Sequence, residues 1–151
     1  MITNILLGTM MMVLTTGIHS VFTVAALLML NRWVHHRDRL HSYESLALIS
    51  GTILMFFGAA LIEVGIWAAA YLRLGAFEGV ESAVYYSMVT FTTLGFGDII
   101  LTERWRLLSS NEAANGIIMF GWTTAVVMTV VQRTIAKVLE HFHRDRGSAS
   151  T

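Results

Sequence analysis

The sequence predicts an all-α membrane protein, and two observations carry that prediction. Hydrophobic residues make up 55% of the 151-residue chain and charged residues only 13%, which is too apolar for an ordinary soluble fold. The charges are also unevenly placed, since residues 1–31 and 113–132 contain none and residues 45–72 contain only Glu63. A bilayer core about 30 Å thick needs about 20 apolar residues in a helix, so each of the three stretches predicts one membrane-spanning helix.

The first apolar stretch has to be distinguished from a signal peptide. It has no positively charged start, and its apolar run is longer than the one such peptides carry. We therefore expect residues 1–31 to form a retained helix, with a cleaved leader as the alternative.

The basic residues predict the orientation of the chain, because Lys and Arg accumulate on the cytoplasmic side of membrane helices. The region between the second and third stretches holds only Arg73, Arg104 and Arg106. The remaining basic residues fall on the opposite side: Arg32, Arg37, Arg39, Arg133, Lys137, Arg144 and Arg146. We therefore expect the N-terminus outside and the C-terminus in the cytoplasm.

The composition argues against several classes of function. Ten basic and ten acidic residues leave no net charge, so nothing favours a nucleic-acid partner. The absence of cysteine excludes disulfides, thiolate metal sites and cysteine catalysis. The apolar stretches offer no paired catalytic groups, so we do not expect an enzyme. We assign no metal site or cofactor, since the histidines simply recur near the basic segments: His35, His36, His41, His141 and His143.

Residues 82–97 do not fit a simple helix bundle. They carry no charge, are too short to span, and begin and end on the same side of the membrane. Residues 82–91 can form about three helical turns, whereas residues 92–98 are rich in β-branched residues and glycine. Extended backbone at membrane depth is tolerated only where protein buries it or where it lines a water-filled path. The pattern therefore predicts a re-entrant loop.

The glycine-rich part of this loop resembles the signature of the potassium-channel pore-loop family, usually Thr-Val-Gly-Tyr-Gly-Asp. In this chain it reads Thr93-Leu94-Gly95-Phe96-Gly97-Asp98. The resemblance implies a selectivity filter in which backbone carbonyls replace the hydration shell of K⁺. The carbonyls that would bind K⁺ belong to Thr93, Leu94, Gly95 and Phe96. Leu94 stands where Val is usual and Phe96 where Tyr is usual, which leaves a weakly selective filter as an alternative.

The same resemblance implies roles for residues around the filter. Tyr85 and Tyr86 match an aromatic cuff, and Asp98 matches a cation-attracting acid at the outer mouth. Gly116 and Gly121 are candidate hinges of the inner helix, although each would also permit close helix packing. The residues expected to line the inner cavity are Thr92, Ile117, Phe120, Thr124 and Met128.

The resemblance also implies an assembly. One chain carries one pore loop, and a pore needs a closed ring of them, so we expect a four-fold homotetramer. Its half-helices would aim their partially negative C-terminal ends at a cation in the central cavity. The expected organisation is an N-terminal transmembrane helix (1–31), a cytoplasmic loop (32–44), a pore domain (45–138) and a cytoplasmic tail (139–151) that extends the inner helix.

We therefore expect three transmembrane helices, a re-entrant pore helix and an extended filter, which together conduct K⁺ passively across the cell (inner) membrane. The partners would be other copies of the chain, membrane lipid and K⁺. No helix carries Arg at every third position, so we do not expect a voltage sensor. The alternatives are a weakly selective cation channel and a non-conducting auxiliary membrane subunit.

Three ionisable residues lie within or beside the apolar stretches. Glu63 is expected behind the filter and hydrogen-bonded to the cuff, with a gating role as the alternative. Glu112 is expected to open the third helix, where a carboxylate suits the helix dipole, and it shares the gating alternative. Either acid could instead be protonated in place. His19 is expected to be packed and hydrogen-bonded, with a proton sensor as the alternative.

Overall fold

The computed structural model describes residues 2–36 and 42–148, and most of that length is helical. Helix α1 spans Ile2–His36, α2 spans Ser42–Arg73, α3 spans Val80–Phe91 and α4 spans Arg106–Ser148. No strand occurs within the described ranges. Part of the expected cytoplasmic loop, including Arg37, Arg39 and His41, lies outside the described residues.

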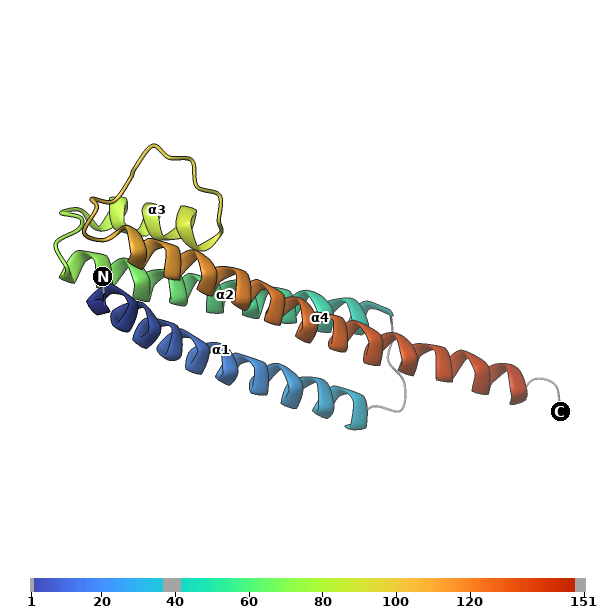
Figure 1. Ribbon diagram of the computed structural model, residues 1–151. Helices are drawn as coiled ribbons and strands as arrows, with labels where there is room; N and C mark the ends of the chain where they lie inside the picture. The colour runs from blue at the N-terminus through green and yellow to red at the C-terminus, as the bar shows by residue number, and fades with distance from the viewer. Residues whose placement is uncertain (1, 37–41, 149–151) are drawn as a thin grey trace.

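Three of the helices are long and apolar enough to cross a membrane, over Ile2–Trp33, Tyr43–Arg73 and Arg106–Leu139. Figure 1 shows α1, α2 and α4 side by side along their length, with α3 packed against one end, which we call the α3 end. The N-terminus lies at the α3 end, and α4 extends past the other helices at the far end. The prediction of an all-α fold with three membrane-crossing helices is confirmed.

Helix α4 begins earlier than its apolar stretch suggests. The stretch starts at residue 113, whereas the helix starts at Arg106 and continues without a break to Ser148. Its first turns mix polar residues with Leu108, which is fully buried in the core at the α3 end. The expected tail therefore continues the same helix as the expected pore domain.

Three groups of buried side chains hold the helices together along the bundle. The largest lies at the α3 end and joins all four helices, with Trp67, Tyr71 and Phe91 among its members. A middle group surrounds Phe56, and a third group surrounds Leu48. Each group draws side chains from α1, α2 and α4, so α1 is part of the packed core rather than a loosely attached extra helix.

One face of α1 is buried along the bundle. Its buried residues recur every three or four positions, or a multiple of that spacing, and form a single stripe. The stripe consists of Asn4, Gly8, Met11, Thr15, His19, Ala26 and Leu30. Asn4 Nδ2 donates to the Arg104 carbonyl just before α4, and Asn115 Nδ2 in α4 donates to the Thr15 hydroxyl over 2.8 Å, so the contacts advance in the same direction along both segments. Helices α1 and α4 are therefore parallel, as Figure 1 also shows.

Candidate functional site

At the α3 end, the chain forms the short helix α3 and then continues as an irregular loop. In Figure 1, α3 points its C-terminal end toward the middle of the bundle, and the following loop arches back to the beginning of α4. Residues 92–98 of this loop are all exposed in the single chain. The loop therefore presents its backbone on an open side of the protomer.

The backbone of the loop alternates in conformation. Thr93, Gly95 and Gly97 have φ of +60°, +56° and +79°, whereas Leu94 and Phe96 between them do not have positive φ. Successive carbonyls of an ordinary extended chain point to opposite sides. A left-handed residue at every second position allows the carbonyls to turn toward one side instead. Glycine adopts these angles freely, which explains its spacing here.

Thr93 adopts the same conformation without being glycine. A β-branched residue at positive φ is strained, by roughly 1–3 kcal/mol, and persists only where its surroundings hold it. Three amides hold it here: the Thr93 N–H donates to the Thr90 carbonyl over 2.9 Å, and the N–H groups of Leu94 and Gly95 both donate to the Val89 carbonyl over 3.0 and 3.2 Å. The C-terminal carbonyls of α3 thus anchor the start of the loop.

A second tie holds the outer end of the loop. The Tyr85 hydroxyl donates to Asp98 Oδ2 over 2.7 Å, which joins α3 to the residue after Gly97. Hydrogen bonding to this carboxylate raises the pKa of the Tyr85 phenol above its ordinary value, so the phenol remains a donor at neutral pH. Phe96 has no hydroxyl with which to hydrogen-bond to α3. The contact between Tyr85 and Asp98 therefore provides a connection between α3 and the outer end of the loop.

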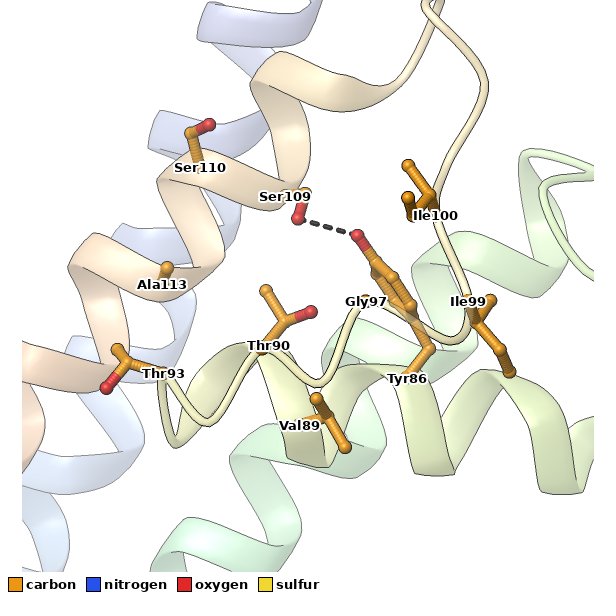
Figure 2. A pocket seen from close by; sticks show the side chains of 11 residues that line it. Tyr86, Val89, Thr90, Thr93, Gly97, Ile99, Ile100, Ser109, Ser110 and Ala113 are labelled. Carbon is orange, nitrogen blue, oxygen red and sulfur yellow. Dashed lines mark hydrogen bonds between the residues drawn. The ribbon is translucent and has the colours of Figure 1, made fainter.

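A cavity of about 350 Å³ lies between the loop and the start of α4. Its lining includes Thr90, Thr93 and Ala113, and Figure 2 shows Tyr86 reaching across it toward Ser109. The Tyr86 hydroxyl donates to Ser109 Oγ over 2.6 Å. Tyr86 therefore braces α3 against α4 directly behind the loop.

Glu112 is the carboxyl group behind the loop, and it is fully buried. Its Oε2 accepts a hydrogen bond of 2.6 Å from the Tyr71 hydroxyl, and its Oε1 is hydrogen-bonded to the Ser87 hydroxyl. The expectation that Glu112 opens the helix was wrong, because α4 begins at Arg106 and Glu112 lies in its second turn. The residue connects α2, α3 and α4 instead.

The Ser87 hydroxyl constrains the protonation of Glu112. Its Oγ lies 3.0 Å from the Val64 carbonyl as well as next to Glu112 Oε1, but a hydroxyl has one proton to donate. A carbonyl can only accept. If Ser87 donates to Val64, Glu112 must donate to Ser87, which requires a protonated carboxyl. That arrangement satisfies every group in the cluster without a buried charge.

Glu63 lies elsewhere. It was expected behind the filter and bonded to the cuff, but its Oε1 lies 2.9 Å from His19 Nδ1 on α1, and both side chains are buried. His19 Nε2 lies 3.2 Å from the Thr123 hydroxyl on α4. The expectation for Glu63 was wrong because α2 turns that residue toward α1 rather than toward α3. His19 is packed and hydrogen-bonded, as expected.

The two candidate hinge glycines differ in their surroundings. A Cβ added to Gly116 would lie 1.9 Å from the Phe91 carbonyl oxygen, so glycine at this position lets the end of α3 pack directly on α4. A Cβ at Gly121 would meet nothing within 4 Å. Close packing accounts for Gly116, and a hinge at Gly121 stays a prediction.

The residues predicted to line an inner cavity lie on an exposed side of the protomer. Ile117, Phe120, Thr124 and Met128 are all exposed, and so is Thr92. Phe120 also stacks edge-on against Phe91, with ring centroids 5.7 Å apart. These four residues of α4 lie after Gly116, the position where α4 packs on the C-terminal end of α3.

Membrane-crossing helices around a half-helix and a returning loop define the class of a pore-loop membrane channel. A family model described as "Ion channel" matches residues 59–133, which run from α2 through α3 and the loop into α4. This segment of the chain thus belongs to a family of pore-loop ion channels. No curated protein and no solved structure gives a match. Helix α1 lies outside the matched residues.

Proposed function

We propose that the protein is a potassium-selective channel in which K⁺ passes through a ring of four filters, each formed by residues 93–97. The observation that carries this proposal is the left-handed backbone at Thr93, Gly95 and Gly97. Alternation at every second residue is what a row of inward-facing carbonyls requires, and such a row can replace the hydration shell of K⁺. An ordinary structural loop has no need of this alternation.

The open side of the protomer supports assembly as a homotetramer. The loop residues 92–98 and the strip Ile117, Phe120, Thr124 and Met128 are exposed in the single chain. A four-fold ring would place both on its axis, with the filter above and the strip below as the wall of a cavity. The C-terminal end of α3 would then direct its partial negative charge toward a cation in that cavity.

Charge supports the remaining assignments. Asp98 at the outer end of the loop would raise the local concentration of cations at the mouth. The distribution of Arg and Lys supports an orientation in a cell (inner) membrane with the loop end and the N-terminus outside and the C-terminal end of α4 in the cytoplasm. No cofactor takes part, and lipid surrounds the exposed apolar faces.

The reversal potential of the purified protein in planar bilayers, with K⁺ on one side and Na⁺ on the other, tests this proposal. We expect reversal near the potassium equilibrium potential. Reversal near zero would instead support a weakly selective cation channel, since Leu94 and Phe96 depart from the usual filter residues.

An electrically silent protein has two explanations, which a second measurement separates. Thallium flux into liposomes is then compared for the Phe120→Ala and Gly121→Ala variants, which widen or stiffen the inner end of the path. Flux in either variant indicates a closed gate in the parent protein. No flux in any of them supports the non-conducting auxiliary subunit.

A further inference from the structure

A buried polar cluster connects α1 to the rest of the molecule, away from the pore loop. His19 and Glu63 have relative exposures of 1% and 0%, and their Nδ1 and Oε1 atoms lie 2.9 Å apart. His19 Nε2 lies 3.2 Å from the Thr123 hydroxyl. The rings of Phe56 and Trp122 pack around the imidazole, with centroids 5.1 and 5.5 Å away. The imidazole therefore joins α1, α2 and α4 in a dry environment.

The number of protons in this cluster decides which way its hydrogen bonds run. With no extra proton, His19 Nδ1–H donates to an ionised Glu63, and the bare Nε2 must accept from the Thr123 hydroxyl. With one extra proton, either on the imidazole or on Glu63 Oε1 where it is donated to Nδ1, Nε2–H donates to Thr123. Binding one proton therefore reverses the hydrogen bond between α1 and α4.

Thr123 differs from several other helix threonines in the partner of its hydroxyl group. Several other helix threonines donate their hydroxyl to the carbonyl four residues earlier: Thr9, Thr15, Thr23, Thr52, Thr124, Thr129 and Thr134. The contact described for Thr123 is with His19 instead. A protonated cluster would release the Thr123 hydroxyl to bond its own helix, as its neighbours do.

The carboxyl side contains an unused hydrogen-bonding position. Glu63 Oε2 is buried and has no hydrogen-bond partner among the described residues. A carboxylate oxygen without a partner in an apolar interior is costly, and neutralising the carboxyl with a proton on the Oε1–Nδ1 contact relieves that cost. The cluster can therefore exist in two states that differ by one proton.

The cluster lies on the helix that would line the pore. Thr123 stands beside Thr124 and near Phe120 on α4, two residues after Gly121. Its contact with His19 ties α4 to α1, whereas the exposed strip of α4 would face the proposed pore. A movement of α4 relative to α1 would break this contact, whereas a joint movement of the two helices would keep it.

We propose that His19 is a positioning residue that makes conduction depend on pH, because a proton shared with Glu63 changes how α1 holds α4 at Thr123. Among the described residues that face the imidazole, Glu63 from α2 is the titratable one, and α4 contributes Thr123 and Trp122. This inference rests on the proposed conduction, and α1 lies outside the residues matched by the ion-channel family.

The test measures K⁺ flux from liposomes that contain the full chain, from about pH 5 to about pH 8. We expect the flux of the parent protein to change by at least about fivefold, the lower end of ordinary allosteric coupling. The His19→Gln and Glu63→Gln variants should give a flat profile. Thr15→Val is the matched control, since it removes another α1–α4 hydrogen bond without a titratable group, and it should keep the parent profile.

Thr123→Val keeps the test decisive if the His19→Gln protein does not assemble. This variant leaves the His19–Glu63 pair in place and removes only its partner on α4, so its profile should also be flat. A pH response that persists in Thr123→Val, or selective flux in the parent that ignores pH, overturns the inference alone. Absence of K⁺ flux at every pH in all variants counts against the proposed conduction itself.

Discussion

Glycine serves two different purposes in this chain. Gly95 and Gly97 have ample space, since the nearest atom to an added Cβ is the Thr93 carbonyl oxygen at 4.0 Å for the first and none within 4 Å for the second. Their positive φ is what requires glycine. Gly116 is the reverse case, because its helical conformation suits any residue but Phe91 leaves no room. The first purpose shapes the backbone of the exposed loop, and the second sets the spacing between α3 and α4.

Gly95→Ala should therefore abolish potassium selectivity while leaving a folded assembly. The new methyl group strains the left-handed backbone and turns the peptide away from the conducting geometry. Reversal potentials under the K⁺/Na⁺ gradient check this, and Phe96→Asp should have the same effect. Gly17→Ala, on an exposed part of α1 with nothing near its added Cβ, is the matched control. Retained selectivity in both filter variants would show that the filter lies elsewhere.

Glu112 should tolerate glutamine better than alanine. Gln can accept from Tyr71 through its oxygen and donate to Ser87 through its nitrogen, as a protonated carboxyl does. Ala leaves both hydroxyls without their partner, at about 1–3 kcal/mol for each group that stays unsatisfied. Thermal unfolding in detergent should rank the parent and Glu112→Gln close together and Glu112→Ala well below. Equal loss in both variants would indicate that the native carboxyl is ionised.

At the scale of the elements, the sequence pattern predicted where the helices and the loop lie. It did not predict which side chains pair across helices. The charge-poor stretches located the three spanning helices, and the glycine-rich run located the loop whose backbone turns at Gly95 and Gly97. The start of α4 was missed because polar residues surround the buried Leu108 in its first turns. The partner of Glu63 was also missed, since His19 lies 44 residues away and only the rotation of α1 and α2 about their axes brings the two together.

The junction of α3 and α4 gives a prediction about this packing. Gly116→Ala places a methyl group 1.9 Å from a backbone oxygen that α3 cannot easily move, so α3 must shift away from α4. Such overpacking typically costs about 1–3 kcal/mol. We expect a lower thermal midpoint and, on size-exclusion chromatography, a weaker assembly of the proposed tetramer. Gly121→Ala, where the added Cβ meets nothing, should leave both measurements unchanged, and a similar loss in the two variants would contradict this account.

At the scale of the whole molecule, the protomer is closed on one side and open on the other. Helix α1 and its buried stripe pack against α4 and α2, whereas no described residue covers the loop residues or the exposed strip of α4. A four-fold ring would cover the open side with water and ions along its axis and with adjacent protomers around it.

Native mass spectrometry of the protein in detergent should therefore show four chains. Phe91→Ala should weaken this assembly, because Phe91 is fully buried at the end of α3 and supports the loop that would face the other copies. Val13→Ala, on the exposed face of α1, should leave the number of chains unchanged. A dimer or monomer as the main species of the parent protein would rule out the four-fold ring.

The pairing of His19 with Glu63 also bears on how the chain enters the membrane during synthesis. Helix α1 leaves the ribosome before α2, and α2 follows with the Glu63 carboxyl group in the second half of its apolar length. The transfer of an unpaired carboxyl group into lipid is unfavourable. Here the hydrogen-bonding partner of Glu63, His19, lies on the preceding helix, which is synthesised earlier. The two helices can thus insert as a hairpin before α4 is made, so α1 provides a template for the insertion of the segment that matches the ion-channel family.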